Sequence, residues 1–164
     1  MSSLLFLVAA VAATSWRFDV RTDPLGQNVY VAEASVSEEL PQAQLKFSCG
    51  GIVGVELQFN LGQASFSGKD FSNEDPAWED VTFVFPEGAY PTTTRQAPLT
   101  DGVGTFEIKG NDAMFIARLF RSGGEVSIEH KTQTARFLLD GAAGPIGDVI
   151  DACPFKYAEQ GGEG

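Results

Sequence analysis

Apolar residues recur at every second position in many short segments of this chain. Residues 43–49 give one example, in which one side of an extended segment carries Ala43, Leu45, Phe47 and Cys49. Such alternation is typical of a β-strand with one buried face. The same pattern predicts further strands at residues 16–20, 28–35, 53–59, 81–85, 104–109, 125–130 and 134–140. The chain is therefore expected to be mostly β.

Turn-forming residues separate these segments. Gly50 and Gly51 lie between two alternating segments, which predicts a tight hairpin turn. Other turns are indicated by Asp23-Pro24-Leu25-Gly26, Pro86-Glu87-Gly88 and Asp101-Gly102. Residues 86–102, rich in Pro and Thr, are expected to form one long loop.

Two segments have the spacing of amphipathic helices instead. Residues 111–124 begin at a candidate N-cap, Asn111, and reach a stop signal at Gly123, with an apolar stripe at Ala113, Ile116, Ala117 and Phe120. Residues 145–153 begin with Pro145, which the first turn of a helix tolerates. Their stripe consists of Ile146, Val149, Ile150 and Cys153. The predicted fold class is mostly β: β-sandwich-like antiparallel sheets with two short helices.

The N-terminal segment is expected to be a secretory signal. Ten consecutive apolar residues, 4–13, would span roughly 15 Å as a helix, about half a bilayer's hydrocarbon thickness. Small residues at its end fit a cleavage site, although no Lys or Arg precedes the apolar segment. The alternative is a buried first strand or helix of the domain. We expect a signal peptide over 1–13, a single β-rich domain over 14–157 and a flexible tail over 158–164, with no membrane span in the mature chain.

The two cysteines, Cys49 and Cys153, both lie on predicted inward faces, one at the end of a strand and one at the end of a helix. An exported chain folds in an oxidising compartment, which favours a disulfide between them. Such a bond closes a loop of about 100 residues, for which chain entropy gives about 4–5 kcal/mol. Two buried free thiols are the alternative. Two thiols and one distant His leave a zinc site short of a ligand, and no Cys-x-x-Cys redox pair is present.

Composition narrows the classes of partner. The 164 residues include 13 Phe, enough apolar material for one domain with its own core. Eleven basic residues face 22 acidic ones, which gives a formal net charge of −11. A surface with this negative charge repels the phosphate backbones of nucleic acids and anionic lipids. Nucleic-acid binding is therefore not expected.

No catalytic motif stands out. His130 is the only histidine, and no Gly-x-Ser-x-Gly elbow accompanies it, so we interpret it as a strand-end histidine with a satisfied hydrogen bond. No phosphate-binding glycine loop is found, and we expect no cofactor. Residues 69–81 contain five carboxylates: Asp70, Glu74, Asp75, Glu79 and Asp80. They could bind calcium, supply the two carboxylates of a glycoside hydrolase, or form a solvated loop. The segment lacks the glycine and final glutamate of a calcium loop, which favours a solvated loop.

The order of these features resembles a known family. Trp16 opens a strand, "DPLGQNVYVAEA" follows it, and then come "LKFSC" and "VGVELQF". Late in the chain "FIARLF", "EVSIEH" and "ARFLLDG" precede a short helix ending at Cys153. This arrangement, over residues 16–154, resembles the small periplasmic proteins associated with type VI secretion, the VasI/TagO-like group. The resemblance implies an accessory factor of the cell envelope without established catalysis.

We therefore expect an exported, non-enzymatic accessory or adaptor protein of the bacterial envelope, periplasmic or secreted. It would bind an envelope protein through a sheet face or through the segments 70–80 and 86–102. Three alternatives stay open: a small-ligand or glycan-binding β module with Tyr90, Trp78 or Phe71 as its platform, a hydrolase that uses Asp70, Asp75 and Asp80, and a subunit held in a membrane complex by an uncleaved N-terminus.

Overall fold

The structure is a computed structural model that describes residues 14–36, 43–62, 78–100 and 103–155, without the side chains of 97–104. The predicted signal peptide at 1–13 and the predicted tail at 158–164 lie outside the described residues. The predicted domain, 14–157, is described up to residue 155 apart from its internal gaps.

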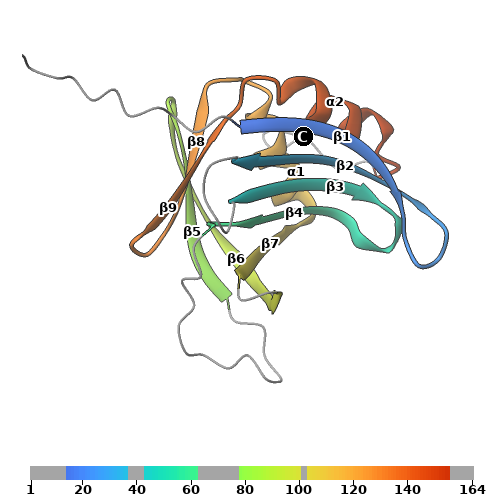
Figure 1. Ribbon diagram of the computed structural model, residues 1–164, viewed down its shortest axis with the longest axis horizontal. Helices are drawn as coiled ribbons and strands as arrows, with labels where there is room; N and C mark the ends of the chain where they lie inside the picture. The colour runs from blue at the N-terminus through green and yellow to red at the C-terminus, as the bar shows by residue number, and fades with distance from the viewer. Residues whose placement is uncertain (1–13, 37–42, 63–77, 101–102, 156–164) are drawn as a thin grey trace, which may run out of the picture.

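The described part of the chain forms one nine-stranded antiparallel sheet with two α-helices (Figure 1). Its spatial order is β1-β2-β3-β4-β7-β6-β5-β8-β9. The strands are β1 (Thr14–Thr22), β2 (Asn28–Val36), β3 (Gln44–Gly50), β4 (Gly54–Asn60), β5 (Trp78–Phe85), β6 (Gly88–Thr100), β7 (Val103–Lys109), β8 (Glu125–His130) and β9 (Gln133–Leu138). The helices are α1 (Gly110–Phe120) and α2 (Ala143–Ala152), and a 3₁₀ turn, η1 (Gly51–Val53), joins β3 to β4. This confirms the mostly-β antiparallel prediction with two short helices.

The sheet folds over, so that strands distant in its order meet across the core. Phe59 on β4 and Phe83 on β5 pack edge to face, with ring centroids 5.4 Å apart, although β7 and β6 lie between their strands in the sheet. The two outermost strands also approach at one end, where Trp16 Nε1 donates to the Leu138 carbonyl at 2.8 Å. In Figure 1, β1–β4 run across the picture, whereas β5, β6, β8 and β9 run steeply through its left side. The arrangement is sandwich-like, built from one continuous sheet.

The inner face of the sheet carries the core, and both helices pack on it. The four residues predicted to share a face of β3 are all buried there: Ala43, Leu45, Phe47 and Cys49. Helix α1 covers β4 and β7, and α2 lies mainly on β2. Phe120 of α1 is fully buried and its ring lies 6.0–6.3 Å from the rings of Trp16, Phe83 and Phe85. Alternation therefore identified the buried face correctly.

The predicted helix starts differ from the observed ones. Helix α1 begins at Gly110 after Lys109, and no side chain caps it, so the prediction that Asn111 is the N-cap is wrong. Gly110 has φ of 68°, which lets the chain turn directly from β7 into the helix without a capping residue. Helix α2 begins at Ala143, which leaves Pro145 in the first turn, as predicted.

The predicted loop at 86–102 is also wrong, because most of it is the long strand β6. Pro86 and Glu87 do form the predicted turn, since Phe85 pairs with Gly88. Pro91 pairs with Thr82 of β5, and pairing of β6 with β7 begins only at Arg95. Pro91 therefore lies where β6 pairs with β5 on one side and has no strand partner among the described residues on the other. The N–H that proline lacks is not needed for pairing with a second strand there.

Asp23 links the turn between β1 and β2 to the turn between β3 and β4. Its Oδ1 accepts hydrogen bonds from the backbone N–H of Leu25 and Gln27, and its Oδ2 accepts one from Ile52 at 3.0 Å. A side chain at Gly51, where φ is 57°, would come within 2.5 Å of Asp23 Oδ2. The predicted turn at Gly50 and Gly51 is confirmed, and glycine is required there by this close approach.

A disulfide joins Cys49 at the end of β3 to Cys153 just after α2, with Cα atoms 5.4 Å apart and a sequence separation of 104 residues. Both half-cystines are buried. The predicted pairing is confirmed, and the bond fastens α2 to the early strands of the sheet. Among the described residues, no helix combines the length and apolar character needed to cross a membrane.

Candidate functional site

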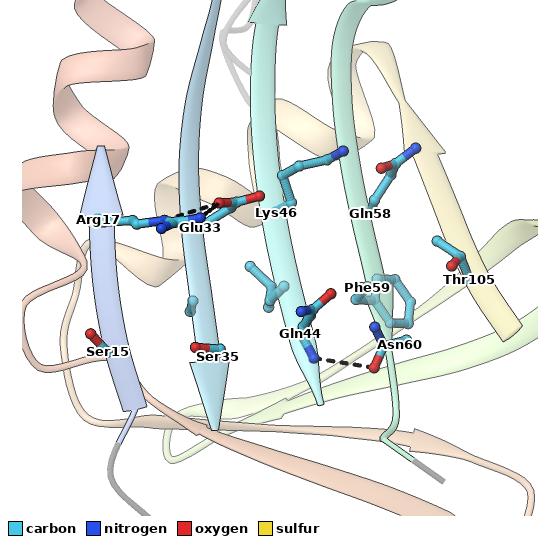
Figure 2. Close-up of a pocket in the computed structure, with 12 residues that line it drawn as sticks. Ser15, Arg17, Glu33, Ser35, Gln44, Lys46, Gln58, Phe59, Asn60 and Thr105 are labelled. Atoms are coloured by element: carbon cyan, nitrogen blue, oxygen red, sulfur yellow. Dashed lines mark hydrogen bonds and ion pairs between the residues drawn. The ribbon is translucent and has the colours of Figure 1, made fainter. Parts of the chain in front are cut away.

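The outer face of the sheet, opposite the helices, carries a row of side chains that crosses from β1 to β5. Strand register places each member directly beside the next. We call this the cross-strand row, and its members in spatial order are Arg17, Glu33, Lys46, Gln58, Glu107, Arg95 and Trp78. Figure 2 shows the first four in line on neighbouring strands. The row exists because every member occupies an outward position of an alternating strand.

Charges alternate along part of this row. Glu33 Oε2 accepts from Arg17 Nη2 at 2.7 Å and from Arg21 Nη2 at 2.8 Å. Burial by itself raises the pKa of the Glu33 carboxyl, but the hydrogen bonds and charges of Arg21 and Arg17 outweigh it, and the pKa lies below its ordinary value. Further along, Gln58 Nε2 donates to Glu107 Oε1 at 3.1 Å. Internal pairs thus hold several of these side chains in place.

A shallow groove of about 440 Å³ lies beside the row (Figure 2). Its floor presents short hydroxyl and amide side chains from neighbouring strands: Ser15, Ser35, Gln44, Asn60 and Thr105. Asn60 Oδ1 accepts from the backbone N–H of Gln44 at 3.2 Å and from that of Gly62 at 3.1 Å. This surface offers many donors and acceptors and little exposed apolar area, so it suits recognition by hydrogen bonds.

Trp78 ends the row and is 66% exposed. It lies directly opposite Arg95 on the next strand. Tryptophan and arginine are the residue types most enriched where protein interfaces gain their binding energy. An indole exposed to this extent beside an exposed guanidinium is the strongest anchor for a partner on this face.

The predicted aromatic platform is only partly present. Tyr90 is half-buried, and its ring packs against Phe85 at 5.7 Å and Phe115 at 5.8 Å between centroids. The prediction that Tyr90 presents an exposed ring is therefore wrong, because an inward position of β6 directs it to the core. Phe71 lies outside the described residues. Trp78 alone is an exposed ring of the predicted kind.

A second set of polar side chains lies on the inner face, near the start of β5 and the end of β8. His130 Nε2 lies 3.1 Å from Glu79 Oε2, and Thr94 Oγ1 donates to the Glu79 carbonyl at 3.1 Å. His130 is 3% exposed, and its ring centroid is 5.0 Å from that of Phe106. The interpretation of His130 as a strand-end histidine with a satisfied hydrogen bond is confirmed.

Gln96 completes this inner polar cluster, which we define as Glu79, Thr94, Gln96 and His130. It is 5% exposed, and within the described part of the chain neither its Nε2 nor its Oε1 has a hydrogen-bond partner. An amide left in this state costs free energy, because it has lost its bonds to water without replacing them.

The acidic stretch does not converge on one point among the described residues. Asp70, Glu74 and Asp75 lie outside them. Glu79 points inward to His130, whereas Asp80 points outward and accepts from Thr93 Oγ1 at 3.2 Å. Adjacent strand residues face opposite sides of a sheet, so these two carboxylates cannot share an ion. Where the chain is described, no three His, Cys, Asp or Glu side chains are arranged to hold a metal.

The chain matches no protein-family model, no curated protein and no solved structure. The resemblance to the VasI/TagO-like group therefore stays a prediction. The cross-strand row was not predicted from the sequence, although a sheet face was expected to bind. Its members come from positions as distant as 17 and 107, and only the pairing of β4 with β7 brings the two halves of the row together.

Proposed function

We propose that this protein is an exported, non-enzymatic accessory or adaptor protein of the bacterial cell envelope that binds a protein partner through the cross-strand row. The row itself supports the proposal most strongly, because it offers an ordered line of polar and charged side chains that includes the Arg17–Glu33 ion pair and ends in Arg95 and Trp78. A partner with a complementary charge pattern would gain specificity from the paired charges and binding energy from the indole.

Export is supported by the disulfide. Crosslinks of this kind persist in oxidising compartments and are rare in the cytosol. The predicted signal peptide at 1–13 and the resemblance to type VI secretion-associated periplasmic proteins point to the same compartment. Intact-mass measurement of the mature protein tests this. A mass that corresponds to a chain starting near residue 13 or 14 would support export, whereas the mass of the full chain would favour a subunit held in a membrane complex by its N-terminus.

The partner surface is tested by crosslinking from defined positions. A photoreactive amino acid replaces Trp78 in one variant and Leu25 in a control; Leu25 is 68% exposed but lies at the β1–β2 turn, away from the row. The chain is expressed in its host, irradiated and isolated, and crosslinked proteins are identified by mass spectrometry. We expect a discrete protein adduct from position 78 that position 25 does not give.

The adduct is then confirmed by affinity. The identified partner is purified, and its binding to the native chain, Trp78→Ala and Leu25→Ala is measured. We expect Trp78→Ala to weaken binding at least tenfold and Leu25→Ala to leave it unchanged. The absence of a specific adduct at position 78, or equal affinities of both variants, would contradict the proposed surface.

A glycan-binding function is the second candidate, favoured by the amide- and hydroxyl-lined groove and by the exposed Trp78 elsewhere on the same face. Sugars pack on exposed indole rings and take hydrogen bonds from side chains of these types. A glycan array probed with the native chain and with Trp78→Ala tests it. Binding that the variant loses would favour this function, and silence of the native chain would remove it.

A further inference from the structure

Strand β1 has an open edge. It is the terminal strand of the sheet, and within the described residues only β2 pairs with it. The Asp23 N–H donates to the Gln27 carbonyl at 2.9 Å, which shows that odd-numbered positions here direct their backbone groups toward β2. Backbone direction alternates along a strand, so Trp16, Phe18, Val20 and Thr22 direct theirs to the open edge. The Val20 N–H accordingly bonds to the Asp19 side chain, at 2.8 Å, instead of to a strand.

The side chains along this edge are unusual for one left open. Phe18 is 39% exposed and Val20 is 46% exposed, although alternation predicts that both share the core side with Trp16. On the outer side the strand carries Arg17, Asp19 and Arg21. Natural sheets usually protect an open edge with proline, a bulge, a short strand or charged side chains. β1 has nine residues, no proline and an unbroken register with β2, and its charged side chains lie on the outer side only.

We propose that a second copy of this chain pairs with β1, antiparallel, about a two-fold axis at Phe18. This register places Phe18 opposite Phe18 of the second copy and Trp16 opposite its Val20. It also places Arg17 opposite Asp19 of the second copy, and the two-fold axis repeats that pair. The strand is therefore complementary to itself in both apolar pattern and charge, which is what an isologous interface requires.

Other registers fit less well. A two-fold axis at Asp19 would place Arg17 opposite Arg21 and Asp19 opposite itself, so like charges would face each other. An axis at Val20 would also give an opposite-charge pair, Asp19 with Arg21. It would, however, place Phe18 opposite Thr22 and Trp16 opposite Pro24, so neither aromatic ring would face an apolar strand residue. At the other end of β1, Leu138 of β9 donates its N–H to Thr14 Oγ1 and accepts from Trp16 Nε1, so β9 occupies that end. The Trp16 bond is made by its side chain, and the backbone groups of Trp16 still face the open edge. Pairing thus extends over Trp16–Val20.

The pairing would extend the sheet, and its outer face, into the second copy. Phe18 and Val20 would lose their contact with water, and the edge-directed N–H and C=O groups would gain partners. This inference does not rest on the proposed function, because a dimer of this kind forms with or without a partner on the cross-strand row.

The first test uses a single added cysteine in chains whose native disulfide is verified by mass. Residues on the axis of such a pair have Cα atoms about 5.5 Å apart, within the range of a disulfide. Phe18→Cys is expected to crosslink to itself under mild oxidation faster than Val20→Cys. Leu25→Cys, exposed but away from the edge, serves as the control. Equal crosslinking of Phe18→Cys and Leu25→Cys would overturn the proposal.

The second test reverses charges without removing apolar contacts. Asp19→Arg alone places arginines opposite one another in the dimer, and Arg17→Asp alone places aspartates opposite one another. Each variant is expected to self-associate at least tenfold more weakly than the native chain in sedimentation equilibrium. Mixed together, the two variants restore both opposite-charge pairs and should form a heterodimer.

Thermal unfolding of each variant alone checks that both remain folded. A native chain that stays monomeric across the concentration range overturns the proposal. So does a mixture that associates no more than its components, since a dimer that ignores these charges would use another surface.

Discussion

The inner and outer faces of the sheet break the simple rule of apolar inside and polar outside in opposite ways. The inner face buries the inner polar cluster, where His130 lies against Phe106, and one member, Gln96, has no hydrogen-bond partner among the described residues. The outer face is polar, yet it buries a carboxylate, Glu56, which is 3% exposed. Glu56 lies 3.4 Å from Lys109 Nζ. Burial therefore costs free energy on both faces, because the nearby Lys109 does not offset the burial of Glu56, whose pKa lies above its ordinary value.

The difference between the faces separates two roles. The inner face holds the molecule together through packing and the disulfide, so its changes should alter stability. The outer face holds most of its charges in exposed pairs, so its changes should alter stability little and recognition more.

The largest effect is expected from removing the disulfide. The double variant Cys49→Ala, Cys153→Ala should lose about 4–5 kcal/mol of unfolding free energy, because the unfolded chain gains the entropy of an open loop of about 100 residues. Urea unfolding followed by circular dichroism measures it. Reduction and alkylation of the native chain is the control and should produce a comparable loss. A loss below about 1 kcal/mol would show that packing of α2 suffices without the bond.

A gain is expected at Gln96. Gln96→Leu keeps a similar volume and removes a buried amide without partners, so the free energy of unfolding should rise by about 1–2 kcal/mol. The matched control is Gln44→Leu on the outer face, where the side chain is exposed and the change should stay within about 0.5 kcal/mol. A loss of stability in Gln96→Leu would mean that its amide makes a bond in solution.

The sequence predicted the inner face much better than the surface that we propose to bind a partner. Alternation identified the strands because one buried face imposes a period of two, and the pairing of Cys49 with Cys153 followed from two inward-facing ends. Alternation did not identify β6, because Pro91 is typical of a loop unless it is known that this part of the strand pairs on one side only. It also missed the cross-strand row, because register between distant strands is set by tertiary packing. Gln96 was missed for the same reason.

Glu56 should show the pH dependence of a carboxylate buried on the outer face. Burial raises its pKa above the ordinary value, and the charge of Glu107 adds to the shift. The folded state therefore binds this proton more readily than the unfolded chain does. Its contribution to stability is present below the unfolded pKa and is lost as pH rises through the folded pKa. Glu56→Gln should be more stable than the native chain at pH 7, by less than Gln96→Leu, and the gain should vanish toward pH 3.

Glu33 provides the opposite sign on the same face and the smallest effect. Its pKa is lowered, so its contribution is present above the unfolded pKa and is lost as pH falls through the folded pKa. Glu33→Gln should lose less than about 1 kcal/mol at pH 7, because the arginines that it pairs with are exposed. Chemical unfolding of Glu33→Gln and Glu56→Gln at a series of pH values compares them directly. The two variants should show opposite pH dependence of their unfolding free energy, because arginine partners stabilise the charged form of Glu33 and burial destabilises the charged form of Glu56. Parallel pH profiles would contradict this distinction.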